Sequence, residues 1–211
     1  MSARDDILRR VRHALRDVQT RDDGEPARER RKPQQPGDVV SLFVERVTDY
    51  KAIVTRCTTS NAAAAVALAL SGTVNVLVPE GFPDELLPGG HRRVEDSGLS
   101  ASALDDVDAV LTTASVGIAE TGTIVLDHGP GQGRRAATLV PDRHVCIVST
   151  NQVVADVSDA VALLDPMRPQ TWVSGPSATS DIELERVEGV HGPRELYVIV
   201  VESESTRSVD N

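Results

Sequence analysis

The sequence predicts an α/β fold in which helices cover both faces of one central sheet, with a helical appendage at the N-terminus. After residue 38, short apolar runs alternate with stretches in which apolar residues recur at helical spacing. The apolar runs are continuous rather than alternating in polarity, which is typical of strands buried on both faces. Such strands need helices above and below them, so a layered α/β sandwich follows.

The size and composition of the chain fit one such domain with an appendage. The chain has 211 residues, of which 40% are hydrophobic and 26% are charged, as in ordinary soluble globular proteins. Only 2% of the residues are aromatic. The core must therefore be built mainly from Val, Leu, Ile and Ala.

The first 37 residues are expected to form an amphipathic helix and a flexible linker. Five apolar residues recur at helical spacing: Ile7, Leu8, Val11, Leu15 and Val18. This stripe must pack on something, either on the chain's own domain or on a partner subunit. Segment 20–37 has three prolines, many charges and no aliphatic residue larger than Ala, so burial cannot offset the entropy lost on ordering it. The domain itself is expected over residues 38–205.

Within residues 38–205, periodicity and apolar runs define the expected elements. Helices are expected at 39–50, 61–70 and 155–164, and Asn61 is expected to cap the second of them. Strands are expected at 52–54, 74–78, 108–113, 124–126, 145–148, 172–173 and 196–201.

Composition argues against several classes of function. No apolar run approaches the roughly 20 residues that span a bilayer, and the charged N-terminus is unlike a signal peptide, so we expect a cytoplasmic protein. A net charge of −10 repels nucleic-acid backbones. Cys57 and Cys146 lie far apart and form no CxxC pair, so this chain alone is not expected to bind an iron–sulfur cluster or another cofactor. The five histidines show no metal-ligand spacing.

The first candidate site is segment 114–123 (ASVGIAETGT), which follows the expected strand at 108–113. Ligands of open α/β sheets bind where loops leave the carboxyl ends of strands, and small residues let backbone N–H groups approach an anion. The binding candidates are Gly117, Thr121, Gly122 and Thr123. Glu120 is the candidate nucleophile, general base or substrate hydrogen-bond acceptor. The alternative is a solvated turn glutamate.

The second candidate site is segment 129–135 (GPGQGRR). Its glycine spacing suggests a phosphate-cradling loop but matches neither the dinucleotide-binding fingerprint nor the P-loop pattern. Arg134 and Arg135 favour anion binding because guanidinium groups bind phosphate or carboxylate bidentately. In an acidic protein, however, both arginines can equally pair with Asp or Glu side chains.

The third candidate site is segment 175–181 (GPSATSD), which follows the expected strand at 172–173. Its small and hydroxylated residues can present donors, and the residues after it can begin a helix whose N-terminus favours anions. The binding candidates are Gly175, Pro176, Ser177, Thr179 and Asp181. The alternative is that Ser180 or Asp181 serves as an ordinary helix cap.

The fourth candidate site is segment 189–193 (GVHGP), which leads into the last expected strand. His191 lies in a glycine-framed turn, where an imidazole can titrate near neutral pH or orient a ligand, and Gly192 is a candidate for ligand contact beside it. A single histidine in a turn is more often structural, so both interpretations stay open.

Three motifs together resemble the LUD domain family, also called the LutC or YkgG family. These are GIAETGT at 117–123, RRAATLVPDRH at 134–144, and GPSATSDIE at 175–183 followed by GVHGP. Their order and spacing cover about the last hundred residues, whereas the first hundred match only in general layout.

The resemblance carries expectations about fold and function. It implies a three-layer α/β/α sandwich similar to the NagB/RpiA/CoA-transferase-like fold. It also implies a role in oxidising L-lactate to pyruvate with LutA-like and LutB-like iron–sulfur proteins, whose clusters lie in those partner subunits. This chain departs from the family at one point, because it has Ala178 and Ser180 where members often have Arg and Ala. Arg134 or Arg135 would then have to supply the missing cation.

Three functional hypotheses follow from these observations. The leading one is a non-cluster subunit of a lactate-oxidising iron–sulfur system. The second is a stand-alone CoA-transferase-like or isomerase-like enzyme on a small anionic substrate, with Glu120 and His191 as catalytic candidates. The third is a module that binds a small carboxylate and docks on a partner through the N-terminal helix.

Overall fold

A computed structural model describes residues 3–14, 16, 36–179, 187–188 and 192–202. The chain divides into two compact units, residues 1–32 and residues 33–211. Among the described residues, no helix has both the length and the apolar character that a membrane crossing requires.

The first unit contains helix α1 (Ala3–Ala14), as the apolar spacing predicts. Asp5 and Asp6 lie in its first turn, where carboxylates complement the helix dipole. Asp6 also forms an ion pair with Arg10, at 3.1 Å. The apolar side chains at helical spacing are exposed: Ile7, Leu8 and Val11.

The second unit is built on a six-stranded sheet in which every pairing is parallel. In spatial order the strands are β1 (Ile53–Thr58), β12 (Glu195–Glu202), β7 (Arg143–Ser149), β4 (Ala109–Thr113), β2 (Asn75–Leu77) and β3 (Arg92–Val94). The central strands are almost fully buried, which explains their continuous apolar runs.

Helices cover both faces of this main sheet. Helix α3 (Ala62–Ala69) packs on one face, together with Val145 and Ile147 of β7. Helix α2 (Pro36–Asp49) packs on the other face, against a core that includes Cys146 and Val148. The side chains of β7 therefore alternate between two cores, as a strand of period two requires. Short helices α4 (Ala101–Asp105) and α5 (Arg135–Leu139) close a third cluster around Leu77.

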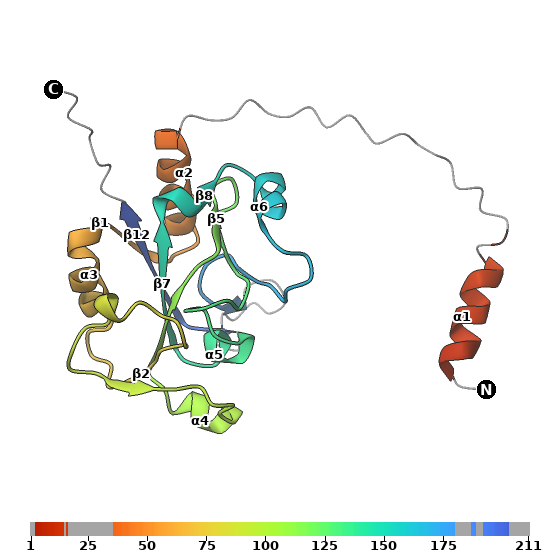
Figure 1. Ribbon diagram of the computed structural model, residues 1–211, viewed down its shortest axis with the longest axis horizontal. Coiled ribbons are helices and arrows are strands. Elements are labelled where there is room, and N and C mark those ends of the chain that lie inside the picture. Colours follow the sequence, from red (N-terminus) through yellow and green to blue (C-terminus); the bar gives the residue numbers. More distant parts are fainter. Residues whose placement is uncertain (1–2, 15, 17–35, 180–186, 189–191, 203–211) are drawn as a thin grey trace. The chain divides into compact units, whose positions relative to one another are not determined.

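A smaller, mixed sheet lies on the α2 side of the main sheet. Its spatial order is β8 (Val153–Val154), β5 (Val116–Ile118), β6 (Thr123–Leu126) and β9 (Thr171–Val173). Strand β6 runs antiparallel to both β5 and β9. Helix α6 (Val157–Leu163) covers one face of this sheet, where Ala160 packs on Ile118 and Val125. Figure 1 shows α3 on one side of β7 and α6 on the other.

The remaining elements are short. The 3-10 turns are η1 (Thr59–Asn61), η2 (Asp84–Leu86) and η3 (Thr150–Gln152). Strand β10 (Ala178–Thr179) pairs antiparallel with β11 (Val187–Glu188).

The observed elements confirm the predicted α/β class, but several details differ. Helix α2 begins at Pro36, inside the expected linker, because proline is well suited to the first turn of a helix. Asn61 precedes α3 as expected, but its side chain makes no capping hydrogen bond. The segment expected as one loop, 114–123, contains strand β5 and forms a β-hairpin with β6.

Candidate functional site

A cleft of about 1050 Å³ opens at the carboxyl ends of the main-sheet strands, and we call it the carboxyl-edge cleft. Thr113 ends β4 and Ser149 ends β7, and both residues line the cleft with Val201 of β12. Its other walls come from the corner between η1 and α3, from segment 81–86 and from segment 127–132. Ligands of open parallel sheets bind at this edge, so the cleft is the candidate functional site.

A network of hydrogen bonds fixes Asp127 in the cleft wall directly after β6. Ser115 donates from its hydroxyl to Asp127 Oδ1 at 2.7 Å, and the Gly129 N–H donates to the same oxygen at 3.2 Å. The Gln132 side chain donates to the Ser115 hydroxyl at 2.8 Å and accepts from the Asp127 N–H at 2.7 Å. The side chains of Ser115, Asp127 and Gln132 therefore each make two of these hydrogen bonds.

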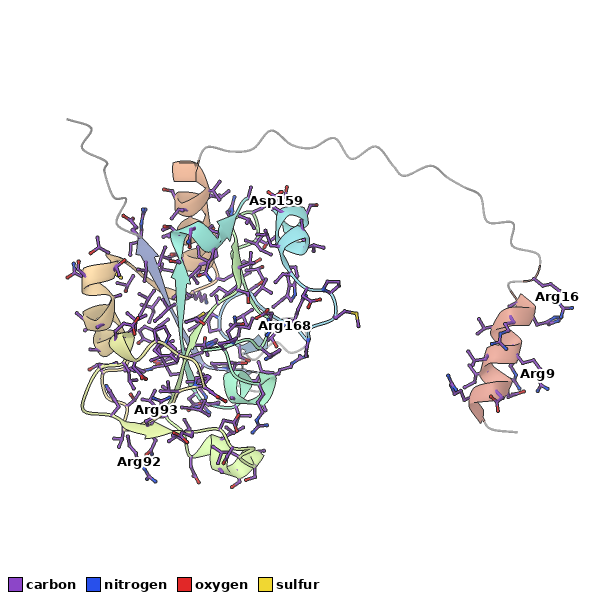
Figure 2. The ribbon with its side chains drawn as sticks, viewed as in Figure 1. Arg9, Arg16, Arg92, Arg93, Asp159 and Arg168 are labelled. Atoms are coloured by element: carbon purple, nitrogen blue, oxygen red, sulfur yellow. The ribbon has the colours of Figure 1, made fainter. Side chains whose placement is uncertain are left out.

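Arg168 brings a positive charge to this carboxylate from a distant part of the chain. Asp165 shapes the turn after α6, because its side chain accepts from the Met167 N–H and its carbonyl accepts from the Arg168 N–H. Arg168 Nη1 then lies 2.7 Å from Asp127 Oδ2. The Arg168 side chain, labelled in Figure 2, keeps 41% of its surface exposed and lines the cleft.

The Asp127 carboxyl stays ionised in this setting. Burial acts to raise its pKa, but the hydrogen bonds from Ser115 and Gly129, the charge of Arg168 and the contact with Gln132 outweigh burial and lower the pKa below its ordinary value. The carboxylate and the guanidinium therefore form a charged pair at neutral pH.

Segment 129–133 forms part of the cleft wall, but its backbone donors are engaged elsewhere. The Gly131 N–H donates to the Glu80 carbonyl at 2.7 Å, and the Gln132 N–H donates to the Gly129 carbonyl at 3.1 Å. These bonds tie the segment to the turn after β2. The N–H groups of residues 129, 131 and 132 are thus used within the protein rather than offered to a phosphate.

His128 links the same segment to the small sheet. Its backbone has a φ of 58°, a left-handed conformation that is uncommon for residues other than glycine. The ring Nδ1 lies 2.7 Å from the Gly133 carbonyl, which can only accept, so Nδ1 carries the proton. The other ring nitrogen, Nε2, lies 3.0 Å from the Thr171 hydroxyl. Residues 127–133 are therefore anchored to the start of β9, close to Arg168 in sequence.

Arg134 and Arg135, the arginines of the second candidate segment, are exposed and are not part of the cleft lining. Arg134 Nε lies 2.6 Å from Asp96 Oδ2, and its Nη2 donates to the Leu99 carbonyl at 2.6 Å. Arg134 is therefore paired with an acidic side chain of the protein, which was the alternative to anion binding in the sequence analysis. Arg135 is the first residue of α5.

The structure brings four other sequence candidates, Thr121, Gly122, Thr123 and Gly175, together with Ser174 in a second region, which we call the hairpin-tip cluster. The Thr123 hydroxyl lies 2.7 Å from the Thr121 hydroxyl and 2.8 Å from the Ser174 hydroxyl. These two hydrogen bonds link the three hydroxyls into one chain. The cluster joins the end of the β5–β6 hairpin to the end of β9.

The glycines of the hairpin-tip cluster lie directly against α2. A Cβ on Gly122 would stand 2.7 Å from the backbone of Arg46, and a Cβ on Gly175 would stand 2.8 Å from the Tyr50 carbonyl oxygen. Gly117, earlier in the same motif, leaves room for the ring of Phe43. Close packing on α2 thus accounts for these three glycines.

The hairpin-tip cluster lies away from the carboxyl-edge cleft. Arg46 and Tyr50 are at the C-terminal end of α2, which leads into the amino end of β1. The next residues also lie at the amino edge of the main sheet, because the Ser177 N–H donates to the carbonyl of Pro193, shortly before β12 begins. The exposed Glu120 belongs to the hairpin tip, where its N–H donates to the Ala155 carbonyl.

The other predicted site residues are placed as follows. Pro176, Ser177 and Gly192 are half-buried. Thr179 belongs to β10. Asp181 and His191 lie outside the described residues. Within the described ranges, no group of three His, Cys, Asp or Glu side chains is arranged to hold a metal ion.

The four side chains of the Asp127 network were not singled out from the sequence: Ser115, Asp127, Gln132 and Arg168. Ser115 and Gln132 lie inside segments that were considered, and Asp127 lies just before one of them. For these three, polar side chains beside small residues at a strand end were the available signal. Arg168 had no signal, because only folding brings it next to Asp127.

Comparison with known proteins gives a consistent family. The LUD domain family matches residues 101–201. The lactate utilization protein C of Deinococcus radiodurans is 47% identical over 174 residues, which cover 80% of this chain and 82% of that protein. The lactate utilization protein C of Shouchella clausii is 31% identical, and the match covers 51% of this chain and 49% of that protein.

One solved structure shares the fold. A crystal structure of a DUF162 family protein from Deinococcus radiodurans superposes with a TM-score of 0.70 at 40% sequence identity. The match covers 80% of this chain and 99% of that one. The parallel sheet flanked by helices is thus common to both proteins.

Proposed function

Because the chain belongs to the LUD domain family and is LutC-like, we propose that it acts as the non-cluster subunit of an iron–sulfur system that oxidises L-lactate to pyruvate. The observation that carries the proposal is its similarity to the Deinococcus lactate utilization protein C over 80% of its length. Oxidation of lactate releases two electrons and two protons, so the system needs an electron acceptor.

The two cysteines of this chain do not fit an iron–sulfur cluster. Cys57 packs with the core on the α3 side of the main sheet, whereas Cys146 lies in the core on the α2 side. Burial raises the pKa of the Cys146 thiol to about 12, a change that the contact with Thr112 only partly offsets, so this thiol does not become a thiolate ligand near neutral pH. Clusters that accept the electrons must therefore belong to partner chains, in this proposal LutA-like and LutB-like proteins.

Deletion of the gene tests this role directly. The proposal predicts that the deletion strain loses growth on L-lactate as sole carbon source but grows normally on pyruvate, and that the intact gene restores growth. Affinity purification of the tagged chain from lactate-grown cells should recover cysteine-rich partner proteins that contain iron and acid-labile sulfide. Unimpaired growth of the deletion strain on L-lactate would contradict the proposal.

A stand-alone enzyme on a small anionic substrate is the second candidate function, and the carboxyl-edge cleft favours it. The cleft places a charged Asp127–Arg168 pair beside a substantial volume at the edge where α/β enzymes bind substrates. The purified chain, incubated with acetyl-CoA and L-lactate, should then transfer CoA from the acetyl to the lactoyl group, which releases acetate and forms lactoyl-CoA that mass spectrometry detects. If no new thioester forms and the deletion strain shows the growth defect, the stand-alone enzyme is excluded and the role in lactate oxidation is supported.

A further inference from the structure

We infer that the carboxyl-edge cleft binds an organic monocarboxylate and that Arg168 anchors the carboxylate through its guanidinium group. L-Lactate is itself a monocarboxylate, so this inference deepens the proposed function and rests on it for the link to L-lactate, whereas carboxylate binding through Arg168 is tested separately. It names the binding group, the chemical class of the ligand and the residues that position the binding group.

The first argument concerns the donors of Arg168. A guanidinium has five N–H donors in a planar fork that matches a carboxylate. The structure shows a single ion-pair partner for this side chain in the described part of the chain, Asp127, which approaches Nη1. With 41% of its surface exposed, the side chain still presents donors to the cleft that it lines.

The second argument is that the protein holds Arg168 in place. Asp127 fixes the guanidinium, and Ser115, Gln132 and the Gly129 N–H in turn fix the Asp127 side chain or its backbone. A Cβ on Gly129 would stand 3.1 Å from Nη2 of Arg168, so the missing side chain lets the guanidinium lie against the backbone. Binding a ligand then costs little additional ordering of this long side chain.

The third argument selects a singly charged ligand. The charged side chains that line the cleft, counted over the described residues, are Glu85, Asp127 and Arg168. One cation and two carboxylates leave the lining with one net negative charge, so the two carboxylates repel a doubly charged phosphate monoester more strongly than a singly charged carboxylate held by Arg168. The net charge of −10 acts in the same direction. The cleft therefore favours a carboxylate over a phosphate.

The fourth argument concerns the rest of the ligand. Apolar groups line the cleft from α3, from segment 81–86 and from the strand ends, and they include Ala63, Leu86 and Ile147. Hydroxyl groups of Thr59 and Ser60 line it as well. A volume of about 1050 Å³ is large for a three-carbon acid, so the cleft also accepts acids with longer organic bodies.

Thermal melting of the full-length protein tests the inference with three probes: L-lactate, octanoate and inorganic phosphate, each against sodium chloride of matched ionic strength. At about 10 mM, a site with a Kd near 1 mM is mostly filled and should raise Tm by about 3–5 °C. We expect this rise with at least one carboxylate and a smaller rise with phosphate. Stronger stabilisation by phosphate than by both carboxylates, or no rise with any probe, would overturn the inference.

Variants then locate the binding group. Arg168→Gln should weaken binding of the active carboxylate by at least about tenfold, because it removes charged hydrogen bonds. Gly129→Ala should weaken binding less, because its Cβ would crowd Asp127 Oδ1 at 3.0 Å and Arg168 Nη2 at 3.1 Å but would remove neither charged group. Arg92→Gln is the matched control, because Arg92 is an exposed arginine on β3 that lies away from Arg168 in Figure 2. Equal binding by the Arg168→Gln variant and the wild-type protein would refute the assignment.

The outcomes separate this inference from the proposed function. If the deletion strain grows normally on L-lactate but the purified protein binds a carboxylate through Arg168, the redox role fails and the inference stands. If the strain loses growth but the protein binds no carboxylate, the inference fails and the redox role stands.

Discussion

The hairpin-tip cluster and the carboxyl-edge cleft use small and polar residues in opposite ways. At the hairpin tip, glycines let the backbone approach α2, and three hydroxyl groups are hydrogen-bonded in a chain. In the cleft, the polar residues hold a charged pair beside an open volume. A motif rich in Gly, Ser and Thr can thus serve packing alone, whereas a site also needs space and exposed charge.

The largest effect is expected where a glycine of the hairpin-tip cluster gains a side chain. Gly122 has a φ of 59°, and a Cβ there would meet the Arg46 backbone at 2.7 Å. Gly122→Ala should therefore lower the free energy of unfolding by about 3 kcal/mol, from backbone strain and overpacking together. Urea denaturation measures the change.

Gly72→Ala is the control for this prediction. Gly72 has a φ of 82°, but a Cβ there would meet nothing within 4 Å. Its substitution should cost only about 1 kcal/mol, the strain contribution alone. Equal losses for the two variants would show that close packing on α2 does not explain Gly122.

Acid should weaken the main sheet, whose carboxyl edge forms the cleft. Burial lowers the pKa of His144 to about 4, from an ordinary value of 6.5, because no charge compensates the buried imidazolium. The Nδ1 atom has no hydrogen-bond partner, while Nε2 lies 2.8 Å from the Thr112 hydroxyl. The fold thus favours the neutral ring, and its contribution to stability is present above pH 6.5 and lost as pH falls towards 4.

This pH dependence can be measured by urea denaturation at a series of pH values. The free energy of unfolding should fall by about 2 kcal/mol between about pH 7 and about pH 5. In a His144→Gln variant the slope over this range should largely disappear, whatever its stability at pH 7. The carboxylates of Asp96 and Asp127 do not contribute to this change. Their pKa values are lowered from 3.8, so the stability that they contribute is lost only below this pH range. If the variant keeps the wild-type slope, His144 is not the origin of the pH dependence.

A matched pair of substitutions separates stability from binding. Thr123→Val removes a buried hydroxyl that bonds to both Thr121 and Ser174, and Asp127→Asn removes the charge that pairs with Arg168. Each change should cost about 1 kcal/mol of stability. Carboxylate binding, followed by calorimetry, should stay unchanged in the Thr123 variant and change in the Asp127 variant. Altered binding in both variants would mean that the two regions are coupled.

The smallest effect is expected at Glu120. Its side chain is exposed at the hairpin tip, so Glu120→Gln should change the free energy of unfolding by less than about 0.5 kcal/mol. A stability loss comparable to that of Gly122→Ala would show that Glu120 contributes to packing of the tip.

The fold class and most elements could be predicted because burial leaves a clear pattern. The strands β4, β7 and β12 are buried along nearly their whole length, and each appears in the sequence as a continuous apolar run. Strand β5 was missed because it has only three residues, one of them glycine. Helix α5 was missed as well, because five residues are too few to show a helical period.

The candidate site was harder to predict, for a topological reason. Strand β9 was expected, and the loop after it was taken as a binding loop at a strand end. Because β9 belongs to the small sheet and pairs antiparallel with β6, its carboxyl end points towards the amino edge of the main sheet, where Ser177 meets Pro193. Periodicity predicts that a strand exists but does not say which sheet it joins. The Asp127–Arg168 contact depends on that assignment and so could not be predicted either.

The most direct test of the site assignment compares one residue from each region in the deletion strain. Strains that carry Arg168→Gln or Glu120→Gln are grown on L-lactate, with growth on pyruvate and protein levels as controls. We predict that Arg168→Gln grows slowly on L-lactate and that Glu120→Gln grows like the wild type. Normal growth of the Arg168 variant together with lost growth of the Glu120 variant would contradict the account and place the functional site at the hairpin tip.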